Sequence, residues 1–362
     1  MTSDDPDRPA PTPSASVADT APVAPVPATP TPAPPPPASD NEVSAAVVAL
    51  GASADAAVVE VQRVVYGQVL PIKLMLTCLL SRGHALLEGV PGTAKTLLAR
   101  SLARTVDARF QRIQFTPDLM PSDVLGTHIF DPRTQSFVLH EGPVFTDVLL
   151  ADEINRTPPK TQAALLEVME ERAVTVDGDR RIVSPVFTVF ATQNPLEFEG
   201  TYPLPEAQLD RFMMKIEVPY PDDESEAAVL RRYGRGGSAH TEADELVQSV
   251  LTTEELHGLL AVVGSVHIED SVLHYVQRLL RASRDSDVLV LGAGTRAGIH
   301  LLVASRAWAA LSGRDFVTPD DIKTLATPVF AHRLLLQADA QVDGLTTADV
   351  VADLLRRVEV PR

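Results

Sequence analysis

The stretch from His84 to Thr96, HALLEGVPGTAKT, constrains the fold of this chain more than any other part of the sequence. A short apolar run at 85–87 predicts a buried strand, and the residues at 97–104 read as a helix. Between them lies a glycine-bearing loop that ends in Lys-Thr. Strand, glycine-bearing loop, Lys-Thr and helix form the layout of a phosphate-binding P-loop, which predicts an α/β nucleotide-binding domain.

Such a loop favours a bound phosphate, because backbone N–H groups and the positive end of a helix converge on it. In the P-loop motif Lys95 adds a positive charge at the β- and γ-phosphates, and the Thr96 hydroxyl is a ligand of Mg²⁺. Ala94 departs from the motif G-x-x-x-x-G-K-[ST], since it stands where the second glycine is expected. The residues expected to bind the nucleotide are Gly89, Val90, Pro91, Gly92, Thr93, Ala94, Lys95 and Thr96.

Charge and cysteine content exclude several classes of protein. The net charge of −17 argues against a nucleic-acid coat or a protein bound to an anionic membrane, because both need a basic surface. The single cysteine, Cys78, cannot form an internal disulfide, which fits a reducing compartment. The N-terminus is acidic, and no apolar run approaches the roughly 18 residues of a membrane span. We therefore expect a cytoplasmic protein that neither binds nucleic acid nor inserts into a membrane.

Composition divides the chain into three parts. Residues 1–41 are dominated by Pro, Ala, Ser and Thr, so we expect a disordered leader, with or without a docking role. Residues 42–221 alternate helical patterns with apolar runs, which predicts the α/β core. Residues 222–362 show helical patterns only and predict an all-helical domain. One of its helices is expected to bury a stripe of Ile299, Leu302 and Val303.

Two further apolar runs end in residues suited to ATP chemistry. Asp152 and Glu153 close a predicted strand 57 residues after Lys95 (152 − 95). A carboxylate at this point can hold the Mg²⁺ shell, and the adjacent glutamate can polarise the attacking water. Asn194 follows another apolar strand, where its amide can bridge that water and the γ-phosphate. The other reading of Asn194 is a turn residue before Pro195.

Two arginines are candidates for the remaining positive charge. Arg211 is either a surface ion-pair partner of Asp210 or Glu206, or a finger that reaches a nucleotide held by a neighbouring subunit. Such fingers raise turnover by about 10³ to 10⁵, because they neutralise charge that develops in the transition state. Arg296 opens a predicted helix of the second domain, where it either reports the nucleotide state or is an ordinary helix-start residue.

Six motifs occur in a characteristic order. They are GHALLEGVPGTAKT (83–96), RIQFTPDLMPSDVLG (112–126), LLADEINR (149–156), FATQNPLEFEGTYPLPEAQLDRF (190–212), GAGTRA (292–297) and VTPDDI (317–322). With them the chain resembles the MoxR family of AAA+ ATPases, in the helix-2-insert group that also holds the magnesium chelatase ATPase subunit. The resemblance covers nearly everything from about residue 45 onward, and the family tolerates alanine at the position of Ala94.

The resemblance implies a fold and a role for each candidate residue. The expected fold is an AAA+ P-loop NTPase core, a parallel sheet flanked by helices, followed by an all-α lid domain. This chain has Gly294-Thr295 where the family more often has Ser-Pro before the lid arginine. The implied roles are Walker A for Lys95 and Thr96, Walker B for Asp152 and Glu153, sensor 1 for Asn194, arginine finger for Arg211 and sensor 2 for Arg296.

The resemblance also implies a ring, usually a hexamer, which uses ATP and Mg²⁺ to act on a protein client. Family relatives act with proteins that carry von Willebrand factor A domains, in chaperone-like maturation or in metal insertion. Hairpins are predicted at 127–139 and 172–183. The part of the first near 131–139 resembles the family's helix-2 insert, and residues 174–183 resemble its pre-sensor-1 hairpin. Two alternatives stay open: a nucleotide-gated scaffold with little turnover, and a DNA-acting motor. A transcription-activator ATPase is disfavoured, because the sequence contains no GAFTGA loop.

Overall fold

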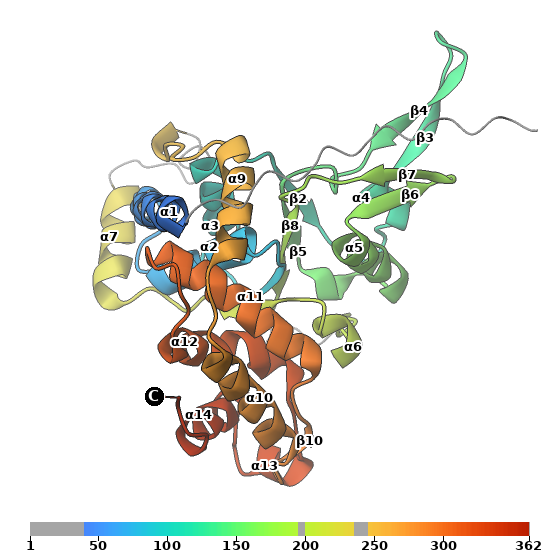
Figure 1. Cartoon of the computed structure of the whole chain (residues 1–362). Coiled ribbons are helices and arrows are strands. Elements are labelled where there is room, and N and C mark those ends of the chain that lie inside the picture. The colour runs from blue at the N-terminus through green and yellow to red at the C-terminus, as the bar shows by residue number, and fades with distance from the viewer. Residues whose placement is uncertain (1–39, 195–199, 235–244, 362) are drawn as a thin grey trace, which may run out of the picture. The chain divides into compact units, whose positions relative to one another are not determined.

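The computed structural model describes residues 40–194, 200–234 and 245–361. The predicted leader therefore lies outside the described residues, except for its last two, which begin helix α1 (Asp40–Gln62). A five-stranded parallel sheet forms the centre, in the order β2-β5-β8-β1-β9 (Figure 1). Its strands are β1 (Ala85–Glu88), β2 (Phe110–Gln114), β5 (Val148–Asp152), β8 (Thr188–Gln193) and β9 (Met214–Glu217). The edge strand β9 was not predicted.

Both faces of the sheet are buried, as is typical of parallel sheets. In β1, Ala85 and Leu87 pack into one apolar cluster, whereas Leu86 between them packs into the other. The first cluster includes α1, α2 (Val69–Leu80) and α3 (Lys95–Thr105), and the second includes α5 (Pro159–Glu171). This arrangement confirms the predicted parallel sheet flanked by helices.

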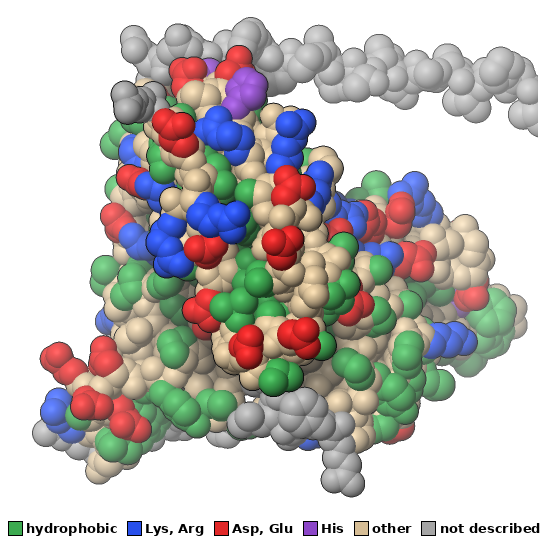
Figure 2. Space-filling view, turned by 90° about the horizontal axis from the view of Figure 1, so that it is seen from below, with side chains coloured by type: hydrophobic (Ala, Val, Ile, Leu, Met, Phe, Trp, Pro, Cys, Tyr) green, Lys and Arg blue, Asp and Glu red, His purple; other side chains and the backbone are tan. Residues whose placement is uncertain are grey.

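The segment after the sheet is a helical lid, as predicted. Its main helices are α7 (Asp223–Tyr233), α9 (Thr253–Ser265), α10 (Asp270–Arg284), α11 (Thr295–Leu311), α12 (Pro319–Phe330), α13 (Ala338–Val342) and α14 (Thr347–Arg357). An unpredicted antiparallel pair, β10 (Leu289–Leu291) with β11 (Leu335–Leu336), lies among them. The face seen from below, in Figure 2, mixes basic, acidic and apolar side chains.

The predicted stripe on α11 is wrong in one position, because Ile299 is 55% exposed. The helix instead buries mostly small residues, such as Ala297 and Ala304, against α1, α2, α10 and α12. At Gly298 a Cβ atom would lie 2.7 Å from Cδ1 of Leu280. Small residues that admit large side chains of neighbouring helices, such as Leu280, therefore replace the large apolar stripe that the sequence pattern suggested.

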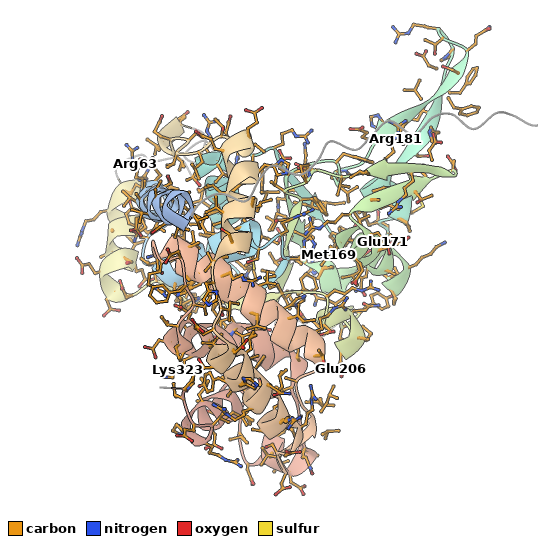
Figure 3. The ribbon with its side chains drawn as sticks, in the orientation of Figure 1. Arg63, Met169, Glu171, Arg181, Glu206 and Lys323 are labelled. Carbon is orange, nitrogen blue, oxygen red and sulfur yellow. The ribbon has the colours of Figure 1, made fainter. Side chains whose placement is uncertain are left out.

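Two hairpins lie on the face of the sheet that α5 covers. They pair β3 (Gly126–Asp131) with β4 (Ser136–Glu141), and β6 (Ala173–Val176) with β7 (Asp179–Ile182). The His128 ring lies 2.9 Å from the Asp177 carboxylate and so links the hairpins. Figure 3 shows Arg181 on the β6–β7 hairpin, with Glu171 at the end of the helix that leads into it. Both hairpins agree with the predicted ones.

One core joins the lid to the α/β part. The first apolar cluster runs without interruption from Leu87 of the sheet, through Val58 and Met75, to Leu301 and Leu325 of the lid. By length and composition, residues 43–62 of α1 could cross a membrane. In this structure one side of α1 instead packs on α2, α3, α9 and α11, as a core helix does.

His84, just before β1, ties the sheet to α5. Its Nδ1 accepts a hydrogen bond from the Val189 N–H (3.0 Å), and its Nε2 donates to the Met169 carbonyl (3.2 Å). This pattern requires a neutral ring. Burial, reinforced by the nearby charge of Arg172, lowers the pKa of His84 to about 3.

Acid should therefore destabilise the protein through His84. The unfolded chain takes up a proton near pH 6.5 and the folded ring only near 3, so stability is lost as the pH falls between these values. At pH 5 the expected contribution is a loss of about 2 kcal/mol in the free energy of unfolding. Denaturant unfolding at pH 7 and pH 5 measures it. The His84→Gln variant should lose correspondingly less over this range, and an unchanged pH dependence would contradict the assignment.

Candidate active site

The loop between β1 and α3 is held tightly against the sheet. At Gly89 an added Cβ would lie 2.5 Å from the Val218 carbonyl oxygen, so only glycine fits. Gly92, at the turn of the loop, has φ +88° and no atom near its Cβ position. Glycine is thus required at Gly89 by close backbone approach and at Gly92 by a left-handed backbone.

Ala94 forms the last left-handed residue of the loop. It has φ +61° and ψ +26° and is the N-cap of α3. A non-glycine residue in this conformation costs roughly 1–2 kcal/mol. Alanine can therefore adopt the left-handed conformation that the motif's glycine adopts freely, but it does so at a greater cost in stability.

Lys95 points back into its own loop. Its amine donates to the carbonyl oxygens of Gly89 (2.6 Å) and Val90 (3.0 Å). Partial burial lowers the pKa of Lys95, while the negative charges of Asp152 and Glu153 oppose that shift. The amine is thus a cation positioned between the loop and the acids at the end of β5.

Asp152 is the last residue of β5 and is oriented by two neighbours. Its Oδ1 accepts from the Thr192 hydroxyl (2.6 Å), and its Oδ2 accepts from Nε (3.0 Å) and Nη2 (2.6 Å) of Arg112. A carboxylate oxygen has two lone pairs, so Oδ1 keeps one for a further partner. Sequence reasoning placed Asp152 correctly at this edge but missed both neighbours.

Glu153 follows with a left-handed backbone, φ +58°. Its N–H donates to the Thr192 hydroxyl (2.8 Å), which fixes the turn after β5. Its Oε2 accepts from Gln114 Nε2 (2.6 Å) and lies 3.2 Å from Nη1 of Arg156. Both contacts are made to Oε2, so they orient the carboxylate without occupying its other oxygen, Oε1.

A cavity of about 1040 Å³ joins these groups. Lys95, Thr96, Asp152, Glu153 and Asn194 all line it, so the structure brings together five of the seven residues predicted for chemistry. Its volume lies at the upper end of what small-molecule sites show.

Part of the lining of this cavity was not predicted from the sequence. Two of these lining residues, Tyr66 and Gln68, belong to the loop after α1, and Tyr233 is the last residue of α7. The Gln68 amide donates to the Pro219 carbonyl (2.9 Å), while its buried Oε1 has no hydrogen-bond partner in the described part of the chain. The tyrosines therefore offer aromatic surface, which suits a nucleobase.

The residues present fit a magnesium ion that is held mostly by phosphate and water. Among the described residues no group of three His, Cys, Asp or Glu side chains could hold a metal alone. Mg²⁺ commonly takes one or two protein oxygens and completes its shell with substrate phosphates and waters. The Thr96 hydroxyl and the Asp152 carboxylate line the same cavity and match that need.

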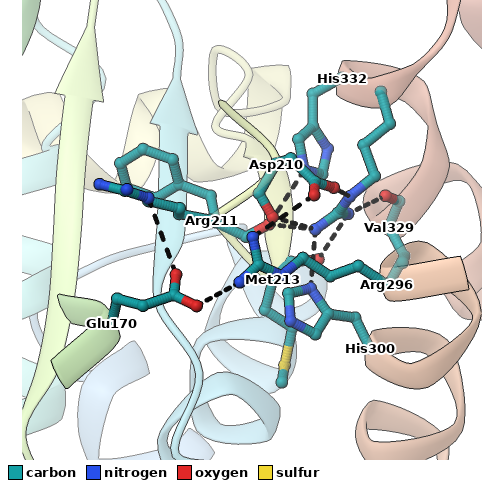
Figure 4. A network of polar contacts seen from close by, with 10 residues as sticks. Glu170, Asp210, Arg211, Met213, Arg296, His300, Val329 and His332 are labelled. Atoms are coloured by element: carbon teal, nitrogen blue, oxygen red, sulfur yellow. Dashed lines mark hydrogen bonds and ion pairs between the residues drawn. The ribbon is translucent and has the colours of Figure 1, made fainter. Parts of the chain in front are cut away.

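Arg211 and Arg296 lie elsewhere in the chain, beside each other (Figure 4). Both line a separate cavity of about 240 Å³. Glu170 joins them, because one carboxylate oxygen pairs with Arg296 and the other lies 3.7 Å from Nε of Arg211. Arg296 also approaches Asp210 at 3.5 Å. The surface-pair reading of Arg211 therefore named the wrong partner, and neither arginine reaches the Lys95 cavity of its own chain.

The missed neighbours left only a weak trace in the sequence. Arg112 and Gln114 alternate along a strand, so they share one face of β2. Strand β2 lies beside β5 in the sheet, and Gln114 is the register partner of Asp152. The alternation was visible, but the identity of the neighbouring strand was not, because strand order follows from tertiary packing.

Comparison with known proteins agrees with this geometry. Residues 84–214 match the ATPase family associated with various cellular activities (AAA), and residues 281–354 match the AAA lid domain. A solved structure of a proposed ATPase from Cytophaga hutchinsonii matches with a TM-score of 0.82 at 39% identity, covering 89% of this chain and 99% of that one. The fold and the site thus define an AAA ATPase with a helical lid.

The relatives narrow the class further. The chain is 43% identical over 305 residues to the uncharacterised YeaC of Bacillus subtilis, covering 84% of this chain and 94% of YeaC. It is 41% identical over 315 residues to the chaperone MoxR1 of Mycobacterium tuberculosis, with 84% and 82% covered. Identity to MoxR of Paracoccus denitrificans is 35%, with 75% and 86% covered. The chain belongs to the MoxR family of AAA ATPases.

The left-handed backbone at Ala94 predicts an unusual response to glycine. Ala94→Gly should raise the free energy of unfolding by up to about 1 kcal/mol, because relief of the strained alanine exceeds the added chain entropy. The matched control is Ala56→Gly in the exposed interior of α1, which should lower it by about 1 kcal/mol. Denaturant unfolding of both variants measures the difference, and equal losses would contradict the conformation assigned to Ala94.

Proposed function

We propose that this protein hydrolyses ATP in an oligomeric ring, expected to be a hexamer, and uses the energy to remodel a partner protein. The observation that carries the proposal is a division of the catalytic groups between two cavities. One cavity holds the P-loop and the acids of β5, and the other holds Arg211 and Arg296. A complete site would need both, so it would form where two subunits meet.

The first cavity supplies the groups that bind ATP. The loop N–H groups and Lys95 would bind the phosphates, and the rings of Tyr66 and Tyr233 would pack against the adenine. Thr96 and Asp152 would hold Mg²⁺, which neutralises charge on the β- and γ-phosphate oxygens. Because all of these groups lie at the carboxyl edge of the sheet, they would keep the reacting phosphate at a fixed place.

The same cavity supplies the groups that act on water. Glu153 would orient the attacking water and take its proton through Oε1, while Gln114 and Arg156 hold Oε2 in place. Asn194 would bridge the water and the γ-phosphate.

The second cavity has positive charge to offer. Arg211, Arg296 and Arg333 carry three guanidinium groups, and the network sets only the two carboxylates of Glu170 and Asp210 against them. Arg211 and Arg296 stay 33% and 40% exposed. The network therefore keeps one net positive charge with two accessible guanidinium groups, and these side chains suit the γ-phosphate of a neighbouring subunit's ATP once they exchange Glu170 for it.

The partner and the setting follow from relatives. One relative is named a chaperone, which supports a chaperone-like role for this chain. By resemblance we propose a client with a von Willebrand factor A domain and a cytoplasmic location. A DNA-acting motor is less well supported, given the net charge of −17 and the mixed charges of the face in Figure 2. Binding to DNA at physiological salt would favour that alternative.

Turnover separates the proposed enzyme from a nucleotide-gated scaffold. Glu153→Gln should bind ATP as wild type does but hydrolyse it at least about 100-fold more slowly, because the general base is lost. Lys95→Ala should lose binding itself. Phosphate release and equilibrium ATP binding measure the two effects, with the exposed Glu254→Gln of α9 as the matched control. Wild-type turnover in Glu153→Gln would remove Glu153 from the mechanism.

Mixing two inactive variants tests the shared site. Lys95→Ala lacks its own nucleotide site but keeps Arg211, whereas Arg211→Ala has the opposite defect. Each alone should lose about 10³ or more in turnover. In mixed rings an Arg211→Ala subunit can meet an intact arginine from its neighbour, so ATPase activity should rise well above the sum of the separate variants. If no activity returns although mixed rings form, Arg211 does not act between subunits.

A further inference from the structure

Arg333 is a buried charge that links the lid to the segment carrying Arg211. It ends the short helix η2 (Ala331–Arg333) that follows α12. Its side chain is only 3% exposed. Burial of a guanidinium is costly unless every donor finds a partner, so its contacts indicate what it holds in place.

Most of those partners lie on the core side, around Arg211 (Figure 4). Nε of Arg333 donates to the Asp210 carboxylate at 2.8 Å. Nη2 donates to the carbonyl oxygens of Asp210 (3.1 Å) and Phe212 (2.5 Å), which flank Arg211 on both sides. Nη1 donates to the Met213 carbonyl at 3.2 Å. One side chain of the lid therefore binds the backbone before and after the candidate finger.

Two contacts on the lid side orient the Arg333 fork. Nη1 donates to the Val329 carbonyl of α12, and Nη2 lies 2.7 Å from Nδ1 of His300, so its two hydrogens are shared among three acceptors. His300 must be neutral to accept this bond, and burial beside Arg333 and Arg296 lowers its pKa to about 4. His300 lies one turn after Arg296 on α11. The Arg333 guanidinium thus joins the segment that carries Arg211 to α12 and to α11, the helix that carries Arg296.

We infer that Arg333 is a positioning residue, which clamps the 210–213 segment to the lid and so sets Arg211 and Arg296 as one unit. The inference rests on the proposed function, in which these arginines serve the nucleotide of the next subunit. A movement of α11 or α12 would then move the finger directly. The state of the lid in one subunit would control hydrolysis in its neighbour.

The test is complementation of Arg333→Lys by Lys95→Ala. Lysine keeps the charge but cannot reproduce a planar fork with five donors. Homogeneous Arg333→Lys should lose at least about tenfold in turnover, less than the loss of about 10³ for Arg211→Ala, with ATP binding at its own P-loop unchanged. Mixed with Lys95→Ala it should regain activity, because its intact P-loop then meets a correctly held Arg211. A defect confined to its own site would not recover.

Controls make the outcomes distinct. The control is Arg314→Lys, near the other end of α12, where Arg314 pairs with Asp321 at 2.6 Å. It replaces a guanidinium by an amine in another ion pair of the lid and should leave turnover near wild type. If Arg333→Lys does not fold, Asp210→Asn removes the ion pair from the core side and should complement in the same way. If Arg211→Ala complements and neither clamp variant does, the clamp is wrong. If Arg211→Ala also fails, the shared site is wrong and the clamp falls with it.

Discussion

The structure depends on one geometric constraint, the common direction of the central strands. Because β1, β5 and β8 are parallel, their carboxyl ends meet at one edge of the sheet. The P-loop leaves that edge from β1, Asp152 and Glu153 leave it from β5, and Asn194 follows β8. Residues about a hundred positions apart, such as Gly92 and Asn194, thus line one cavity.

The remaining positive charge that we propose for catalysis lies in a different part of the structure. The P-loop edge is occupied by the phosphate cradle and by the β2 residues that hold the acids, Arg112 and Gln114. Arg211 and Arg296 instead gather where the last core strand meets the lid, around Glu170. The buried Arg333 fastens that junction. In our account, one subunit therefore presents a nucleotide and the next presents the charge that completes the site.

Much of this was predictable from local sequence. Apolar runs predicted three of the five strands, and alternation of apolar and polar residues at 110–115 predicts a fourth. Residue type and position predicted Lys95, Asp152 and Glu153 at the sheet edge. What the sequence did not predict depends on contacts between distant segments. Arg112 and Thr192 act through strand order, Arg333 through the docking of the lid, and the buried face of α11 through small residues that hydrophobic patterning ignores. The domain boundary at 221/222 stays a prediction.

The central claim is that hydrolysis needs two subunits, and turnover per subunit as a function of protein concentration tests it most directly. The oligomeric state is followed in parallel by sedimentation in the presence of ATP. We predict that turnover per subunit rises with concentration and follows the fraction of assembled protein, because only assembled subunits receive an arginine from a neighbour. Constant turnover per subunit across the range in which the ring dissociates into monomers would contradict the account.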